Sequence, residues 1–275
     1  MCFETNDYCL IEPEVAYTST THLAIVAHQD DAEIIGYSAI QSCFQKPEQW
    51  FGAITLTNGG GASRGGRYHG VSDSTLSEIR QKEQIKAAQL GEYSFCQQWL
   101  ATSQQIKLDQ DTASSQLSNT LLKVLPKVIY THNPFDKHAS HRAVLSIVIL
   151  ALKKVAKTHP DYKPKVLGIE VWGSLDWLPD QYKVELDCSP MPNLEQALIG
   201  LYDSQIDGNK GYDRAVLGRR ASNATFNSSH SNDTLRSVNI GIDLSHLSAS
   251  ETSLTEFSEQ VLKAFTTEKL SNLTA

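Results

Sequence analysis

The sequence predicts an α/β fold in which a mostly parallel β-sheet is flanked by helices. Short runs of apolar and β-branched residues alternate along the chain with longer segments of helical periodicity. These helical segments are about 10–20 residues long, which suits right-handed β-α-β crossovers. In such a sheet, ligands bind beyond the carboxyl ends of the strands, so we look there for functional residues.

The first half of the chain follows this alternation. Strands are predicted at residues 23–27, 51–57 and 128–131, and helices at about residues 32–45, 74–90, 120–125 and 138–157. The second helix has the clearest register, because Leu76, Ile79 and Ile85 recur near helical spacing and Gly91 supplies a stop. Residues 102–119 are rich in Ser and Gln, which predicts a loop before the third helix.

The second half contains fewer clear elements. Strands are predicted at residues 165–172 and 183–187, and helices at 194–203 and 250–269. Residues 222–233 are rich in Ser and Asn and predict a loop, which together with residues 218–220 is a candidate for a mobile lid. We find no internal repeat.

Composition excludes several classes of function. The chain of 275 residues has 24 basic and 31 acidic residues, so its formal charge of −7 argues against a nucleic-acid surface. The longest apolar stretch, residues 143–152, is shorter than the roughly 20 residues of a membrane helix. Residues 1–20 show no signal-peptide pattern, and the five dispersed cysteines suit a reducing compartment. We therefore expect a cytoplasmic protein.

A first group of chemically active residues follows the first predicted strand. His28, Asp30 and Asp31 lie in the turn where that strand gives way to a helix. A purely structural role for Asp30 or Asp31 is the alternative, because an aspartate at this position often caps the following helix.

A second group follows the strand at residues 128–131. His132, Asp136, His138 and His141 lie within ten residues, and His138 and His141 can share one helical face. Both groups occupy strand ends, so the topology brings them to the same edge of the sheet. Two imidazoles and one carboxylate around an open position form the ligand set of a catalytic zinc site. The surplus carboxylate and imidazole are then free for proton transfer in a hydrolysis.

These two groups resemble the motifs of a known family. Residues 28–33, His-Gln-Asp-Asp-Ala-Glu, are similar to the A-H-P-D-D-x-E motif of the PIG-L (LmbE-like) family of zinc N-acetylglucosamine deacetylases. Residues 131–141 resemble the family's T-H-x-x-x-D-x-H-x-D-H motif, and the Arg-x-x-Glu helix at residues 78–83 lies between them. The matches occur in the family's order over residues 23–145.

The resemblance implies a Rossmann-like sheet and a set of roles. His28, Asp31 and His141 would bind Zn²⁺, with Fe²⁺ as an alternative metal. Asp30 would be the general base that activates water, and His138 would stabilise the oxyanion and protonate the leaving amine.

Two positions depart from the family's motifs. Gln29 replaces the usual Pro, and Ser140 replaces the usual Asp. Neither position is a ligand, so the implied metal set is unaffected. Asp136 is then the candidate to orient an imidazole from outside the ligand shell.

Candidate substrate-binding residues are more weakly indicated. They are Arg64, Arg80, Trp172, Asp176 and Gln205. Each has a structural alternative: Arg80 can form an ordinary helix-face ion pair with Glu83, and Trp172 can be a core residue. The glycine-rich segment 58–67 lacks the phosphate-binding motifs, which predicts a flexible loop beside the site.

Our prediction is a single domain, residues 1–275, with a metal-binding core at about 20–160 and a substrate-shaping part at about 161–275. It would hydrolyse the N-acetyl group of a small amino-sugar substrate containing N-acetylglucosamine, releasing acetate and a free amine, and could form a homo-oligomer. The same chemistry on another amide, such as a thiol conjugate or antibiotic precursor, is one alternative. A second alternative is a non-catalytic protein that binds a carbohydrate or a metal. A nucleotide-binding protein is disfavoured, because Asp30 and Asp31 in the turn after the first strand would repel phosphates.

Overall fold

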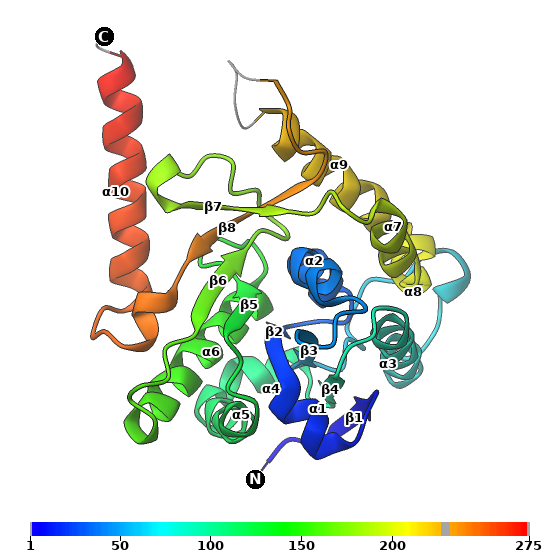
Figure 1. The fold of residues 1–275 in the computed structure, drawn as a ribbon. Helices are drawn as coiled ribbons and strands as arrows, with labels where there is room; N and C mark the ends of the chain where they lie inside the picture. The colour runs from blue at the N-terminus through cyan, green and yellow to red at the C-terminus, as the bar shows by residue number, and fades with distance from the viewer. Residues whose placement is uncertain (1, 227–231, 274–275) are drawn as a thin grey trace.

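One β-sheet connects both halves of the chain in the computed structural model, which describes residues 2–226 and 232–273 (Figure 1). The strands are β1 (Thr5–Cys9), β2 (Thr20–Val26), β3 (Trp50–Thr55), β4 (Phe95–Trp99), β5 (Val128–His132), β6 (Lys165–Ile169), β7 (Lys183–Asp187) and β8 (Val238–Asp243). Their order across the sheet is β1-β4-β3-β2-β5-β6-β8-β7.

The centre of this sheet is parallel, as predicted. β4, β3, β2, β5 and β6 pair in parallel, whereas β1, β8 and β7 add antiparallel edges. From β2 the chain builds outward first to β3 and β4, and then returns to the other side of β2 to form β5 and β6. The strand order therefore reverses between β2 and β5, which is the place where α/β sheets bind ligands.

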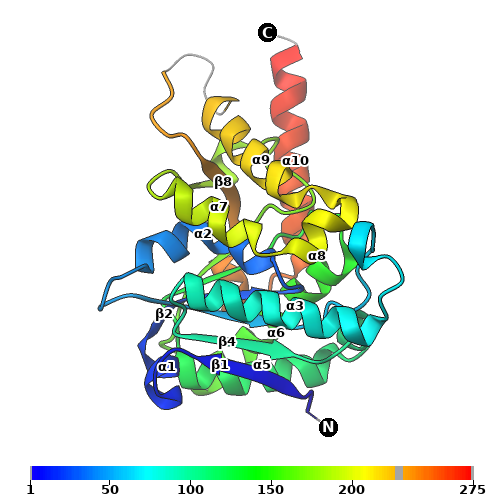
Figure 2. The ribbon, with the colours of Figure 1, turned by 90° about the vertical axis from the view of Figure 1, so that its right-hand side faces the viewer.

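Helices cover both faces of the sheet (Figures 1 and 2). They are α1 (Pro13–Ser19), α2 (Asp31–Cys43), α3 (Asp73–Leu90), α4 (Ser103–Leu108), α5 (Gln110–Val124), α6 (Ala139–Thr158), α7 (Pro192–Gly200), α8 (Asp203–Gln205), α9 (Tyr212–Phe226) and α10 (Leu254–Leu273). The helices α2, α3 and α7 pack on one face, and α1, α5, α6 and α10 contribute to the core on the other.

The strand β2 shows why the central strands are apolar throughout. Leu23 and Ile25 point into the core beneath α5 and α6, while Ala24 and Val26 point into the core beneath α2. All four side chains are fully buried. A strand covered on both faces needs apolar residues at every position rather than at alternate positions.

The loop predicted at residues 102–119 is wrong, because this segment forms α4 and most of α5. Thr102 and Gln105 form a capping box at the start of α4, and the Asp109 side chain accepts a hydrogen bond from the Thr112 backbone at the start of α5. Leu117 and Leu121 then bury one face of α5. The sequence did not predict α4 and α5 because the polar residues at their caps and on their exposed faces are also typical of loops.

The region after residue 165 also departs from the prediction. β6 ends at Ile169 rather than at residue 172, and residues 222–226 belong to the helix α9 instead of a loop. The segment 218–220 is helical too, so this part of the suggested lid is a helix; residues 227–231 of that suggestion lie outside the described residues. The strands β1, β4 and β8 and the helix α1 were not predicted.

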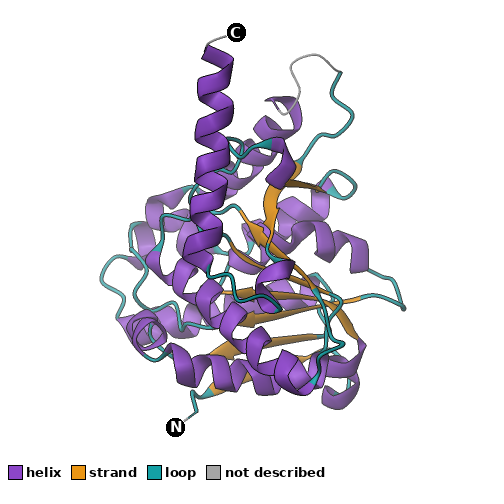
Figure 3. Ribbon diagram, turned by 90° about the vertical axis from the view of Figure 1, so that its left-hand side faces the viewer, coloured by secondary structure: helices purple, strands orange, loops and turns teal. Residues whose placement is uncertain are grey.

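The helix α10 runs away from the sheet at the carboxyl end of the chain (Figure 3). Phe257 and Val261, near its beginning, are buried in the core, whereas Leu270 and Leu273 near its end are exposed. No helix in the described part of the chain has the length and apolar character needed to cross a membrane.

Candidate metal centre and active site

A cavity of about 380 Å³ lies beyond the carboxyl ends of β2 and β5, where the strand order reverses. Its walls come from the β2–α2 turn, the glycine-rich loop, α3, α4, the start of α6 and the segment around α8. The lining residues are His28, Asp30, Asp31, Ile34, Gly59, Gly61, Ala62, Ser63, Arg80, Ser103, Lys107, His138, Ser140, Val171, Trp172, Gln205, Lys210 and Tyr212.

The turn between β2 and α2 has an unusual backbone at Asp30. Its φ of 97° lies in a region that residues other than glycine rarely adopt, at a cost of about 1–3 kcal/mol. Its side chain makes no capping hydrogen bond to α2, so helix capping does not explain this aspartate. Asp31 instead accepts a 2.8 Å hydrogen bond from the His28 backbone, which ties the turn together.

Three side-chain atoms from the two motifs converge beside this turn. The Nδ1 of His28 lies 3.2 Å from Asp31 Oδ2 and 3.2 Å from His141 Nε2, and the remaining edge of the triangle, His141 Nε2 to Asp31 Oδ2, is 3.4 Å. A tetrahedral ion with bonds of about 2.0–2.1 Å separates its ligands by about 3.3–3.4 Å. The three donors therefore have the spacing and the chemistry to hold a divalent metal.

Asp136 supports this triangle from behind His141. Its Oδ2 lies 3.1 Å from the Nδ1 of His141, on the side of the ring away from the triangle. Its other oxygen accepts a 2.7 Å hydrogen bond from the His138 backbone at the start of α6. One carboxylate thus orients His141 and fixes the backbone at His138. At position 140 the chain has a buried Ser, so Asp136 supplies the supporting carboxylate.

His132 is a further buried imidazole whose role the sequence did not reveal. Its Nε2 accepts a 2.9 Å hydrogen bond from the Ala27 backbone, so this nitrogen carries no proton. Its ring stacks on His141 with centroids 3.8 Å apart. Asp31, His132 and His141 also offer ligand atoms close enough to share a metal, but the hydrogen bond from Ala27 occupies the lone pair of Nε2.

The charges of the triangle depend on one another. Burial would lower the pKa of His141, but Asp31 and Asp136 outweigh it and raise that pKa to about 10. Burial would likewise raise the pKa of Asp31, but His141 and His132 hold it well below its ordinary value. Without a metal, the site thus balances the Asp31 carboxylate with a proton on His141.

Asp30 lies beside the triangle and is held by Arg80. Burial raises the pKa of Asp30 well above its ordinary value, and Arg80 opposes this rise. The Arg80 guanidinium lies 3.5 Å from the Asp30 carboxylate and donates to the backbone carbonyls of Gln29 and Gly59. Glu83 accepts hydrogen bonds from the Ser204 backbone and hydroxyl instead. Arg80 and Glu83 therefore do not form the helix-face ion pair considered from the sequence.

His138 occupies the other side of the triangle. Its ring centroid lies 4.8 Å from that of His28 and 4.7 Å from that of His141. Burial, with the neighbouring histidines, lowers the pKa of His138 to about 4. Its Nδ1 is buried without a hydrogen-bond partner among the described residues. A nitrogen of His138 lies close enough to His28 and His141 that these three form a second group able to share a metal.

The predicted substrate-binding residues divide into two sets. Arg80, Trp172 and Gln205 line the cavity, although Arg80 is only 3% exposed. Arg64 instead bonds to Asp73 and to a loop carbonyl, and is not among the lining residues. Asp176 is exposed, accepts a hydrogen bond from Ser174, and also lies outside the cavity wall.

Several lining residues were missed by sequence reasoning. Ile34, Lys107, Lys210 and Tyr212 come from α2, α4 and the segment around α9, and none belongs to a recognisable motif. Tyr212 packs edge to face against Trp172, with ring centroids 5.8 Å apart. Only the folded chain brings these residues to the cavity, so no local signal could have identified them.

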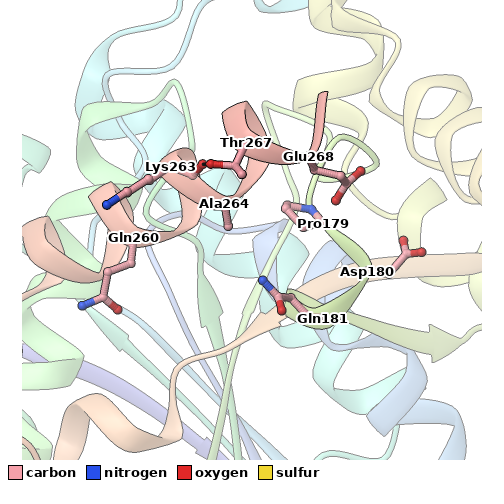
Figure 4. Close-up of a pocket in the computed structure, with 8 residues that line it drawn as sticks. All are labelled: Pro179, Asp180, Gln181, Gln260, Lys263, Ala264, Thr267 and Glu268. Carbon is pink, nitrogen blue, oxygen red and sulfur yellow. Dashed lines mark hydrogen bonds between the residues drawn. The ribbon is translucent and has the colours of Figure 1, made fainter. Parts of the chain in front are cut away.

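A larger hollow of about 600 Å³ lies elsewhere, between residues 179–181 and α10 (Figure 4). Its charged residues are Asp180, Lys263 and Glu268. Asp180 pairs with Lys183 and Glu268 with Lys269, so both carboxylates already have partners. With no histidine or cysteine in its wall, this hollow lacks the groups that the smaller cavity concentrates.

Comparison with known sequences points to one family. The sequence model of the PIG-L family, described as GlcNAc-PI de-N-acetylase, matches residues 23–152, which include both motifs. No curated protein matches the sequence.

Solved structures share the fold at low sequence identity. An N,N'-diacetylchitobiose deacetylase from Pyrococcus horikoshii has 16% sequence identity and a TM-score of 0.65. The alignment covers 89% of this chain and 90% of the deacetylase chain. GalB, a 4-carboxy-2-hydroxymuconate hydratase from Pseudomonas putida KT2440, has 17% identity and a TM-score of 0.63, with coverages of 82% and 96%.

A third structure is the A40926 pseudoaglycone deacetylase Dbv21, with 15% identity, a TM-score of 0.60 and coverages of 85% and 100%. At these identities the structures establish a common fold, in agreement with the predicted α/β sheet. The sequence match is the stronger finding about descent. By this match, residues 23–152 of the chain belong to the PIG-L family.

Proposed function

We propose that this protein is a metal-dependent deacetylase that hydrolyses the N-acetyl group of an N-acetylglucosamine-containing substrate. The observation that carries the proposal is the arrangement of Asp30 and His138 beside the triangle of His28, Asp31 and His141. A protein that only stores metal has no need of a strained carboxylate and an unpartnered imidazole next to the ion.

The metal is proposed to be zinc, with ferrous iron as the alternative. Two imidazoles and a carboxylate suit either ion, so the donor set does not discriminate between them. When bound, the ion would act as a Lewis acid toward the amide carbonyl and lower the pKa of water. Asp136, which holds the far side of His141, would keep that ring oriented toward the ion.

Asp30 is proposed to take the proton from the attacking water. Its raised pKa makes it a stronger base than an exposed aspartate, and proton transfer is most efficient when a group's pKa is close to the working pH. Arg80 holds the turn through backbone carbonyls and keeps the carboxylate in place.

His138 is proposed to stabilise the developing oxyanion and to protonate the departing nitrogen. An amide nitrogen leaves only after it gains a proton, because an amide anion is a poor leaving group. The Nδ1 of His138 has no partner within the described structure, and its ring belongs to the cavity wall. Because its pKa is about 4, His138 is neutral at the start of the reaction and gains its proton as negative charge develops on the substrate.

The proposed sugar specificity rests on the cavity wall. Trp172, which is 37% exposed, offers a ring face to the C–H groups of a sugar, and Gln205 offers an amide for its hydroxyls. Both come from the second half of the chain. We therefore propose that residues 1–275 act as one domain, with residues 161–275 shaping the pocket.

Fold similarity alone does not decide the reaction, because a hydratase shares this fold with two deacetylases. The compounds in their names also differ: 4-carboxy-2-hydroxymuconate, N,N'-diacetylchitobiose and the A40926 pseudoaglycone. An amide other than an N-acetylglucosaminide is thus the main alternative for this chain.

The test is acetate release from a panel of N-acetylglucosaminides and other N-acetyl amides, before and after chelation and after restoring Zn²⁺ or Fe²⁺. Asp30→Asn should keep the metal and lower turnover by about 10²- to 10⁴-fold. Asp243→Asn, at an exposed strand end, is the matched control. Wild-type turnover by Asp30→Asn would refute its role, and turnover only of other amides would change the proposed substrate. Metal binding with no turnover of any amide would favour the non-catalytic alternative.

A further inference from the structure

The turn that carries Asp30 has the geometry of a type II β-turn. The Asp31 backbone N–H donates a 3.3 Å hydrogen bond to the His28 carbonyl, which closes a four-residue turn over residues 28–31. Asp30, the third residue, has φ 97° and ψ −31°, close to the values of about 80° and 0° at that position of a type II turn. The φ of Gln29 is not positive, which excludes the mirror-image turn. Glycine is the usual third residue, so an aspartate there is strained.

A less strained turn is open to the same four residues. In a type I turn the peptide between the second and third residues is turned over, and the third residue has a φ of about −90°. The two ends of the turn stay in place, so His28 and Asp31 keep their positions in either form. The forms differ in the peptide between Gln29 and Asp30 and in the direction of the Asp30 side chain. Other contacts must therefore hold this peptide in the strained form.

Two side chains of α3 bind the two polar atoms of that peptide. Arg80 donates to the carbonyl of Gln29, and the Oε1 of Gln84 accepts a 3.4 Å hydrogen bond from the backbone N–H of Asp30. Arg80 and Gln84 are four residues apart, so they share one face of the helix, and they are 3% and 0% exposed. In a type I turn the carbonyl and the N–H would point away from these partners. The helix α3 thus selects the type II form.

The amide of Gln84 has a fixed orientation because Glu33 binds its other end. Gln84 Nε2 donates a 3.0 Å hydrogen bond to Glu33 Oε1, so the amide oxygen faces Asp30. The fully buried Glu33 also accepts hydrogen bonds of 2.7 Å and 2.6 Å from the hydroxyls of Tyr93 and Tyr202. Gln84 itself is not part of the cavity wall, so it acts on the turn and not on a substrate.

Gln29, the second residue of the turn, is held by its side chain. Proline is common at this position because its ring presets φ, and the family's motif has proline here. In this chain Gln29 Nε2 donates hydrogen bonds of 3.0 Å to the Thr57 carbonyl and 3.2 Å to Gln98 Oε1. These bonds tie the turn to the end of β3 and to β4. Tertiary contacts thus supply part of the constraint that a proline ring would supply covalently.

We propose that Gln84 is a positioning residue for the general base, Asp30. Together with Arg80 it keeps the turn in the type II form, which places the Asp30 carboxylate beside the metal-binding triangle. This inference rests on the proposed role of Asp30 and extends it to a residue outside both motifs and outside the cavity wall. A displacement of about 1 Å in a catalytic group can lower the rate by about 100-fold. Loss of Gln84 therefore acts on kcat, while the metal ligands and the substrate contacts stay in place.

The test compares Gln84→Met with Tyr93→Phe. Both remove one donor from the buried Glu33 carboxylate and should lower the melting temperature by similar amounts, but only Gln84→Met also removes the acceptor of the Asp30 N–H. With the N-acetyl substrate that the wild type hydrolyses, we expect Gln84→Met to lower kcat by about 10- to 100-fold, with KM and Zn²⁺ affinity within about twofold of the wild type. Tyr93→Phe should keep its kcat. A crystal structure of Gln84→Met should show the peptide turned over and a negative φ at Asp30.

Wild-type kcat in Gln84→Met would overturn the inference. An equal loss of kcat in Tyr93→Phe would overturn it too, because the effect would then be one of general packing around Glu33. If Gln84→Met does not fold, Gln84→Asn takes its place, since the shorter side chain cannot reach both Glu33 and Asp30. If the wild type hydrolyses no amide, the proposed function fails, and the crystal structure decides the inference separately. A turned-over peptide supports it, and a peptide in the wild-type orientation overturns it.

Discussion

Replacing Asp136 by Asn tests whether a residue outside the triangle tunes the metal. In the structure the carboxylate lies 3.1 Å from His141 Nδ1 and accepts hydrogen bonds from the backbones of His138 and Trp172. Burial opposes ionisation of Asp136, but the His141 ring 3.1 Å away holds its pKa below the ordinary value. Asn keeps the size of the side chain and removes its charge.

The expected magnitude follows from the contact that is lost. A hydrogen bond to a charged group contributes about 1.5–3 kcal/mol. At about 1.4 kcal/mol for each factor of ten, the metal affinity should fall by about 10- to 100-fold. Loss of an outer-shell partner in metal sites generally has an effect of this size. The amide nitrogen would also face a backbone N–H, so a modest loss of stability should accompany the loss of affinity.

Competition with a chromogenic chelator measures this affinity directly, for Zn²⁺ and for Fe²⁺ under anaerobic conditions. Thermal unfolding of the chelated protein separates a folding defect from a metal defect. Asp243→Asn provides the matched control, since its carboxylate also accepts a backbone hydrogen bond but lies outside the cavity. A variant at position 136 that binds metal within twofold of the wild type would refute the reasoning.

Three further predictions follow from the same structure. His138→Gln should keep the metal but lower kcat by about 10²- to 10⁴-fold, and wild-type kcat with full metal content would contradict its role. Burial would lower the pKa of His141, but Asp31 outweighs it and raises the pKa to about 10, above the unfolded value of about 6.5. The protonated ring therefore stabilises the chelated protein fully below pH 6.5, and the melting temperature should fall as the pH rises toward 10; an equal slope in His141→Gln would show that another group is responsible. Arg220→Met should lower the free energy of unfolding by about 3–5 kcal/mol in urea titrations, because it leaves the buried Glu195 carboxylate without its cationic partner and with only the Ser237 hydroxyl as a donor. A loss below 1 kcal/mol would mean that Glu195 is solvated or paired elsewhere.

Local sequence patterns were sufficient to predict those helices and strands whose apolar residues are buried on one face or on both. The strand at residues 23–27 and the helix at 74–90 appear within a few residues of their predicted positions. The helix α5 was missed because its buried leucines are separated by Ser, Thr and Asn, which favour loops when tertiary contacts are ignored. The strand β4 was missed because two of its five buried residues, Gln97 and Gln98, are polar and interrupt the apolar run that is typical of a central strand.

The sequence by itself determined the chemical groups of this protein and their place at two strand ends. Motif spacing is a local property, so His28, Asp30, Asp31, His138 and His141 could be recognised before any fold was known. Parallel pairing of β2 with β5 then accounts for the meeting of the two motifs.

Only the tertiary structure decided how the groups are held and what surrounds them. Arg80 turned out to hold the Asp30 turn, Arg64 to lie outside the cavity, and Lys107 and Lys210 to line it. The physical reason is that such contacts join residues far apart in the chain. Their partners and burial depend on packing that no local pattern records.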